Sequence, residues 1–199
     1  MIRSFIPPSE IEVATQEFLN EHHPEKTIPI PVEDIIEINL GINIVPTPGM
    51  MDSFGIDAMF AHDFSQINID EHQFNSVETR ARFTLAHELG HYVLHRQYVE
   101  EQKFEDTDQW KKFVLSDLHR EPLETQANMF ASTLLMPTDH VESQFEAAKQ
   151  VLAKNPTFAN GKLPDDVTLA PYLAKDMARA FNVSEETATW RVERWLKTR

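Results

Sequence analysis

The chain has 199 residues, of which 41% are hydrophobic and 25% charged, as in an average globular domain, so wholesale disorder is excluded. It contains no cysteine, which excludes disulfides, iron–sulfur clusters, cysteine-ligated zinc and cysteine nucleophiles. Its 18 basic and 32 acidic residues give a formal net charge of −14, which disfavours direct binding to nucleic acids because their phosphates are also negative.

The sequence carries no sign of membrane insertion or secretion. No run approaches the roughly 18 consecutive apolar residues that a transmembrane helix needs. Pro7 interrupts the N-terminus before an apolar signal-peptide segment can form. We therefore expect a cytoplasmic protein that contacts no membrane.

The N-terminal third predicts two helices followed by a small sheet. Ser9 and Glu12 have the spacing of a capping box, which predicts a helix over residues 9–21. A second, short helix is expected over residues 32–40, because Gly41 suits the position after a helix end. Short β-favouring segments then predict three strands, at residues 42–45, 56–61 and 66–70.

A long helix is predicted over residues 77–98, with Asn75 or Ser76 as its N-cap. Apolar residues recur every fourth position along it and are expected to face the core: Leu85, Leu89 and Val93. Residues 99–120 are acidic and irregular, which favours a surface connection over a lid.

The C-terminal half predicts only helices. Pro122 suits the first turn of a helix that ends before Pro137. Further helices are expected at residues 139–153, 169–181 and 185–198. Residues 173–192 also scan as a helix-turn-helix.

An HExxH motif, residues 87–91, lies within the predicted long helix. Residues four apart share a helix face, so His87 and His91 can converge on one zinc ion. Glu88 is displaced by one residue and is the candidate general base that takes a proton from a water molecule. Chance expects only about 0.04 such motifs in a chain of this composition.

A third protein ligand must come from elsewhere in the chain. His95 lies eight residues after His87, about 12 Å along a helix, so it cannot share the ion and is expected to be structural or at the cleft rim. The metzincin pattern also fails, because residue 94 is leucine and residue 97 is glutamine. Glu124 on the next helix is the preferred ligand, with Glu121 as the rival, and Asn128 could hydrogen-bond one of the histidines.

Other polar residues near the motif have no role that spacing alone assigns. An oxyanion-stabilising donor is expected among six histidines and tyrosines: His62, His72, His119, His140, Tyr98 and Tyr172. For Arg80 and Arg82, one or two turns before the motif, structural ion pairing is favoured over substrate positioning.

Two stretches of the sequence, residues 80–95 and 124–137, resemble the ImmA/IrrE family of bacterial metallo-endopeptidases. Residues 30–42 and 181–184 are also similar to segments of that family, so the resemblance extends over most of residues 28–196. The long acidic segment at 96–120 does not map onto the family pattern.

The resemblance implies a zinc peptidase with a gluzincin-like site. It makes His87, His91 and Glu124 the zinc ligands and Glu88 the base. It also implies that the partner is a helix-turn-helix repressor, which the enzyme cleaves. An extended segment of that partner is expected to pair with the strand at residues 56–61.

Two other functions compete with the peptidase. The helix-turn-helix pattern favours a DNA-binding regulator, and a catalytically silent zinc module could act by protein–protein contact alone. An intact Glu88 argues against the silent module, because metal retention does not require it. The predicted fold is α+β, mostly helical, with a three-stranded sheet beside the motif helix. We expect a peptidase core over residues 1–154 and a helical subdomain, packed on that core, over residues 155–199.

Overall fold

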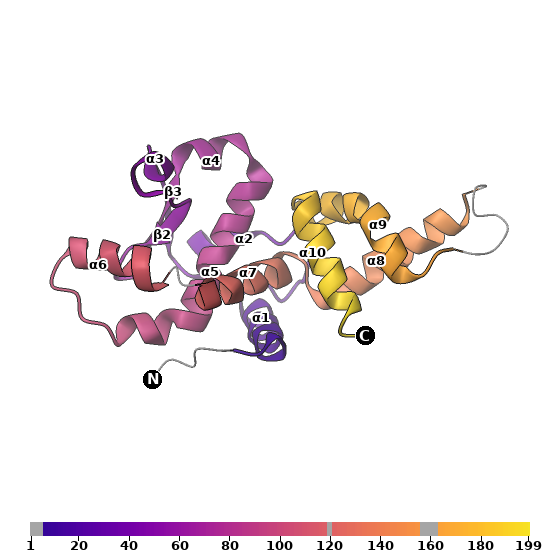
Figure 1. Ribbon diagram of the computed structural model, residues 1–199, viewed down its shortest axis with the longest axis horizontal. Coiled ribbons are helices and arrows are strands. Elements are labelled where there is room, and N and C mark those ends of the chain that lie inside the picture. The colour runs from indigo at the N-terminus through magenta and orange to yellow at the C-terminus, as the bar shows by residue number, and fades with distance from the viewer. Residues whose placement is uncertain (1–5, 119–120, 156–162) are drawn as a thin grey trace.

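In a computed structural model, which describes residues 6–118, 121–155 and 163–199, the chain adopts the α+β fold that the sequence predicts (Figure 1). The three strands are β1 (Asn43–Thr47), β2 (Ala58–Phe60) and β3 (Gln66–Asp70). The α-helices are α1 (Pro8–His22), α2 (Val32–Asp34), α3 (Met50–Phe54), α4 (Glu71–Ser76), α5 (Glu78–Glu100), α6 (Thr107–Phe113), α7 (Glu121–Leu135), α8 (Thr138–Ala153), α9 (Asp166–Phe181) and α10 (Glu185–Leu196). Two π-helical turns, η1 (Ile35–Asn39) and η2 (Val114–Leu118), continue α2 and α6.

The sheet has the strand order β1-β3-β2. β1 runs parallel to the central strand β3, and β2 runs antiparallel to it. Alternate residues of β2 and β3 are buried against the helices, as one face of a pleated sheet requires: Ala58, Phe60, Ile67 and Ile69. β2 is thereby an edge strand, and it contacts α5.

The core of the molecule forms where α5 crosses α7 (Figure 1). Leu85 and Leu89 of α5 are fully buried, as the four-residue spacing predicts, and so are Phe130 and Leu134 of α7. α1 packs across α7, where Phe18 meets Phe130 edge to face with ring centroids 5.9 Å apart. These contacts hold α7, which carries Glu124, against α5, which carries the HExxH motif.

The predicted N-caps of the first helix and of the long motif helix are wrong, whereas the predicted Ser184 cap of the last helix is confirmed. α1 begins at Pro8, with Pro7 as its N-cap and no side-chain cap, because proline suits the first helical positions. Asn75 and Ser76 lie inside α4, so α5 begins after Val77 without a side-chain cap. The capping carboxylate belongs instead to α4, where Asp70 accepts a hydrogen bond from the Gln73 backbone N–H at 3.1 Å.

The acidic segment after α5 is not an irregular connection over residues 107–118, where α6 and η2 form. Trp110 is 2% exposed and packs against Phe104 and Phe113. Its indole N–H donates to the Phe60 carbonyl of β2 at 3.2 Å. The buried residues of this helical segment do recur at helical spacing, at Trp110, Phe113 and Val114, but this short pattern follows a strongly acidic stretch that obscured it.

The last two helices form the helix-turn-helix that residues 173–192 predict. α9 ends at Asn182 in the left-handed region (φ +53°), and the Ser184 hydroxyl caps α10 by accepting from the Thr187 N–H at 3.0 Å. In the described residues, no helix is long and apolar enough to cross a membrane.

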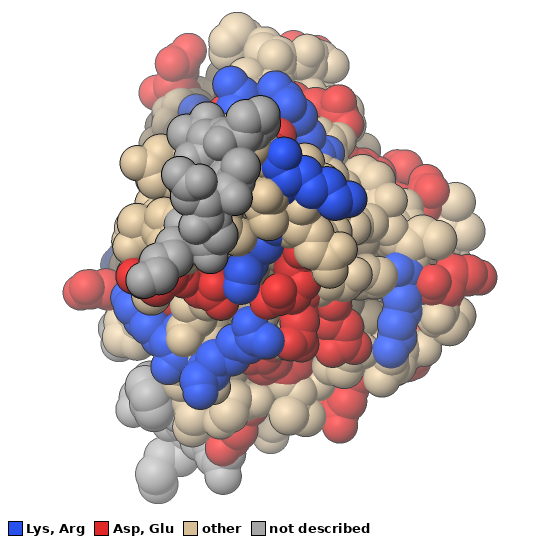
Figure 2. All heavy atoms as spheres, turned by 90° about the vertical axis from the view of Figure 1, so that its right-hand side faces the viewer, with Lys and Arg blue, Asp and Glu red and all other residues tan. Residues whose placement is uncertain are grey.

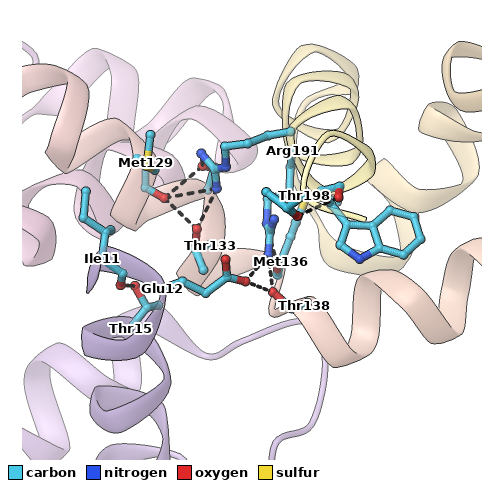
Figure 3. Close-up of polar contacts among 12 residues, drawn as sticks. Ile11, Glu12, Thr15, Met129, Thr133, Met136, Thr138, Arg191 and Thr198 are labelled. Atoms are coloured by element: carbon cyan, nitrogen blue, oxygen red, sulfur yellow. Dashed lines mark hydrogen bonds and ion pairs between the residues drawn. The ribbon is translucent and has the colours of Figure 1, made fainter. Parts of the chain in front are cut away.

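Two arginines of α10 donate hydrogen bonds to the rest of the protein, and Figure 3 shows the surroundings of one of them, Arg191. Arg191 is 1% exposed and donates to the Met136 carbonyl at 3.0 Å and to the Thr138 hydroxyl at 2.7 Å. Glu12 of α1 lies 3.5 Å from the same guanidinium. Arg194 donates to the Thr133 hydroxyl of α7 at 2.6 Å. α10 is thereby fastened to α1 and to the C-terminal end of α7.

Candidate metal centre

The HExxH motif lies in the middle of α5, opposite α7. A close approach of the two helices depends on the motif glycine. A Cβ atom on Gly90 would lie 2.9 Å from the Ala127 Cα and 3.0 Å from the Ala127 carbonyl oxygen, closer than side chains tolerate. Because residue 90 has no side chain, α7 can bring Glu124 and Asn128, which flank Ala127 on its helix, up to the motif histidines.

Three side chains converge at this crossing. The Nε2 atoms of His87 and His91 lie 3.0 Å apart. The Glu124 carboxylate places Oε1 3.2 Å from the His91 Nε2 and Oε2 3.5 Å from the His87 Nε2. One ligand atom from each residue lies within 4.8 Å of the others. These are the ligands that the sequence and the family resemblance both point to.

The donor set fits a divalent metal ion. Tetrahedral zinc holds ligand atoms at about 2.0–2.1 Å, which places neighbouring ligand atoms about 3.3 Å apart. The separations between His87, His91 and Glu124 of 3.0 to 3.5 Å match that geometry without rearrangement. Two imidazoles and one carboxylate leave a fourth position for a water molecule or substrate, as catalytic zinc sites do.

Burial and charge act differently on the two histidines. Burial lowers the pKa of His91 to about 3, so its imidazole is neutral at pH 7 and offers a lone pair to a metal. Burial also opposes the charged form of His87, but the hydrogen bond with Glu124 and the charges of Glu88 and Glu124 outweigh it, and the His87 pKa is raised. A metal ion must therefore displace the proton that His87 and Glu124 share.

A cavity of about 270 Å³ opens at the metal centre. Glu88 lines it together with His87 and Glu124, and the Glu88 residue is only 4% exposed. The cavity is also lined by the segment that leads into β2, residues 55–58, and by Phe83 of α5. The candidate base thus shares one cavity with the candidate metal ligands and the edge strand.

Further polar residues surround the ligands. The Asn128 Oδ1 lies 2.9 Å from the His87 Nδ1, the role that the sequence suggests for it. The His95 Nδ1 lies 3.0 Å from the His91 Nδ1, and the His95 Nε2 lies 3.0 Å from the Gln126 Oε1. Sequence reasoning missed Gln126, because its position two residues from Glu124 gives no helical-face signal.

Other residues considered from the sequence do not contribute ligand atoms to the cluster in the described part of the chain. His95 is 3% exposed, so it is structural and does not lie at a cleft rim. Glu121 is absent from the metal-ligand cluster of the described residues. Five of the proposed oxyanion donors do not line the cavity at the metal centre: His62, His72, His140, Tyr98 and Tyr172. The sixth, His119, lies outside the described residues.

The two arginines before the motif make structural pairs. Arg80 contacts both carboxylate oxygens of Asp57, each at 3.0 Å, and so ties the start of α5 to the segment before β2. Arg82 is 5% exposed and donates to the Ile30 carbonyl at 2.7 Å and to the Asn182 carbonyl at 3.2 Å. Arg82 therefore joins three distant parts of the chain.

The family of the chain follows from a comparison with known protein families. A family model described as the IrrE N-terminal-like domain, Peptidase_M78, matches residues 39–193. The chain belongs to this family. The match includes the HExxH helix, Glu124 and the C-terminal helix pair, as the resemblance to ImmA/IrrE peptidases anticipates.

One solved structure, described as a Mycobacterium tuberculosis transcriptional regulator, has a similar fold with a TM-score of 0.50 and 16% identity. The similarity covers 90% of this chain and 45% of that chain, so the present chain spans less than half of the regulator's length. At this identity the likeness shows the fold alone. No curated protein matches the chain.

Proposed function

We propose that this protein is a zinc-dependent endopeptidase that cleaves a helix-turn-helix repressor. The observation that carries the proposal is the convergence of His87, His91 and Glu124 beside a cavity that Glu88 also lines. Membership of a metallopeptidase family supports the same chemistry. The repressor as partner rests on the family resemblance, and the cytoplasm, where such repressors act, is the proposed location.

His87, His91 and Glu124 would hold the zinc ion. When bound, zinc polarises the scissile carbonyl and lowers the pKa of a water molecule. Glu88 accepts the proton of the attacking water and returns it to the leaving amine. The enclosed position of Glu88 keeps this proton transfer away from bulk solvent.

The edge strand β2 is the proposed binding place for an extended substrate segment. The Asp57 carbonyl and the Ala61 N–H bond to β3, at 2.8 Å each, so the intervening antiparallel pattern directs the backbone groups of Ala58 and Phe60 away from β3. Trp110 already occupies the Phe60 carbonyl, whereas Ala58 lines the catalytic cavity. We therefore place the main substrate pairing at Ala58.

The C-terminal helix pair is proposed to stabilise the core and not to read DNA. Arg191 and Arg194, which a recognition helix could direct at phosphates, are bonded to α7 and the start of α8. The end of the molecule that carries α8, α9 and α10 shows basic and acidic side chains side by side (Figure 2). We also propose a division into a core, residues 1–154, and a subdomain, residues 155–199, that is packed on the core through the hydrogen bonds of Arg191 and Arg194.

The test uses Glu88→Gln, which is nearly isosteric and removes the base. We expect the variant to bind zinc as the wild type does and to cleave about 10²–10⁴-fold more slowly, because an amide cannot accept the proton. Zinc content is measured by mass spectrometry. Cleavage is measured with a purified helix-turn-helix repressor, taken from the neighbouring gene if that gene encodes one. Near wild-type cleavage by fully zinc-loaded Glu88→Gln would refute the mechanism, and sequence-specific duplex binding by the protein alone would favour the regulator.

A further inference from the structure

Two buried residues outside the ligand set form a hydrogen-bonded chain that ends at the metal centre. His95 follows His91 by one helical turn, and both histidines are at most 3% exposed. Their Nδ1 atoms lie 3.0 Å apart. The other ring nitrogen of His95, Nε2, lies 3.0 Å from the side-chain oxygen of Gln126, which is 4% exposed. The chain therefore runs from α7 through His95 to His91 without reaching solvent.

The amide oxygen of Gln126, at one end of this hydrogen-bonded series, determines which atom donates in each hydrogen bond. The Gln126 Oε1 is an amide oxygen and can only accept a hydrogen bond, so the His95 Nε2 must carry the proton. A neutral imidazole has one N–H, which leaves the His95 Nδ1 as an acceptor. The His91 Nδ1 must then be the donor in the 3.0 Å contact, and the His91 Nε2 keeps its lone pair.

The first motif histidine has an equivalent anchor. The Asn128 Oδ1 lies 2.9 Å from the His87 Nδ1 and keeps a proton on that nitrogen, so a lone pair becomes available at the His87 Nε2 once the proton shared with Glu124 is displaced. The two Nε2 atoms face each other 3.0 Å apart, beside Glu124. α7 therefore supplies one carboxylate ligand and, at positions 126 and 128, the acceptors that orient both imidazoles.

We propose that His95 and Gln126 are positioning residues that hold His91 as its Nδ1–H tautomer, so that Nε2 is ready to bind zinc before the metal arrives. This inference deepens the proposed metal site. Without the hydrogen bonds to His95 and Gln126, His91 can carry its proton on Nε2, the atom that must coordinate the metal. Zinc binding then has to drive a change of tautomer. Loss of such orienting partners typically weakens metal binding about 10–100-fold.

The first measurement is the ¹⁵N NMR spectrum of the metal-free protein, which distinguishes the two neutral tautomers of each histidine. We expect the wild-type His91 to be protonated at Nδ1. Gln126→Leu removes the acceptor at similar size and should give a mixture of His91 tautomers. Gln126→Glu keeps an oxygen acceptor and should retain the wild-type tautomer. Gln97→Leu, an exposed change on α5, is the matched control.

The second measurement is zinc affinity, determined by competition with a chelator. Gln126→Leu should bind zinc about 10–100-fold more weakly, while Gln126→Glu and Gln97→Leu should stay near the wild-type value. Thermal unfolding of each variant separates this effect from a loss of folding.

Two results would overturn the proposal: a wild-type His91 protonated at Nε2, or a folded Gln126→Leu with unchanged tautomer and affinity. The wild-type spectrum alone decides the direction of the chain, even where a variant does not fold. Because that spectrum requires neither zinc nor cleavage, a protein that shows the Nδ1–H tautomer and binds no zinc would contradict the proposed function and leave this inference standing.

Discussion

At the residue scale, the metal centre is the part of the molecule that its sequence predicts best. The HExxH spacing alone places two imidazoles on one helix face, and the structure has their Nε2 atoms 3.0 Å apart. The role of Asn128 could be predicted in the same way, because Asn128 follows Glu124 by one helical turn. The role of Gln126 could not be predicted from the sequence, because its contact with His95 depends on how α5 crosses α7, and no local spacing encodes that crossing.

The ligand assignment predicts distinct metal contents for four proteins. Zinc should be bound at about one ion per wild-type chain, be lost in His91→Ala, and fall markedly in Glu124→Ala, since each change removes a ligand. Glu121→Ala is the control, on the same helix and outside the cluster. Metal content after dialysis checks the prediction, and full zinc in Glu124→Ala with loss in Glu121→Ala would reverse the assignment.

At the element scale, the packing of α5 on α7 predicts the effect of Gly90→Ala. Alanine in a helix is ordinarily favoured over glycine by about 1 kcal/mol. Here the new Cβ would press on the Ala127 backbone at 2.9 Å, and overpacking costs about 1–3 kcal/mol. The clash should win, so Gly90→Ala should lower the free energy of unfolding and also weaken zinc binding, because α7 carries Glu124.

Urea unfolding and chelator competition measure these two effects of Gly90→Ala. Gln97→Ala, at an exposed position of the same helix, is the control and should be neutral or slightly stabilising. A Gly90→Ala protein more stable than the wild type would show that α7 shifts freely, contrary to the close packing described.

A pH dependence follows from Asp70 at the end of β3. Its carboxylate accepts hydrogen bonds from the backbone N–H groups of Met51 and Gln73, at 3.1 Å each, and these bonds lower its pKa. A depressed folded pKa means that the stabilisation is present above the unfolded value of about 3.9 and is lost as the pH falls through the folded pKa. The free energy of unfolding should therefore drop below about pH 4, and less steeply in Asp70→Asn.

Unfolding by urea at a series of pH values from neutral to acidic measures this dependence. Asp52→Asn, at an exposed position of α3, is the matched control and should keep the wild-type slope. Equal acid sensitivity of Asp70→Asn and the wild type would show that the Asp70 cap contributes nothing to it.

The elements themselves divide into those that periodicity predicts and those that it misses. α5 and α7 were predicted because apolar residues recur every three or four positions over many turns. α6 was missed because its apolar pattern, Trp110, Phe113 and Val114, is short and follows an acidic stretch, and because the hydrogen bond from Trp110 to the Phe60 carbonyl of β2 has no local signal. The parallel pairing of β1 with β3 was also hidden, because the intervening residues 48–65 include another strand and a helix.

At the scale of the whole molecule, charge and burial decide what the C-terminal helices do. The chain has a net charge of −14, and both arginines of α10, Arg191 and Arg194, bond to other parts of the protein. Burial lowers the pKa of Arg191 to about 10, which still leaves it charged at pH 7. The carbonyl of Met136 and the carboxylate of Glu12 partly offset the cost of burying that charge.

We therefore expect Arg191→Met to lower the free energy of unfolding more than the same substitution of a surface arginine does. Methionine fills much of the volume but leaves the Met136 carbonyl without its donor, which costs about 1–3 kcal/mol. Arg179→Met on α9 breaks only an exposed pair with Asp176 and should change the free energy of unfolding by less than about 1 kcal/mol. Urea unfolding of the two variants measures the difference. Equal effects would mean that α10 is not fastened to the core through Arg191, and its basic side chains would again be candidates for binding a partner.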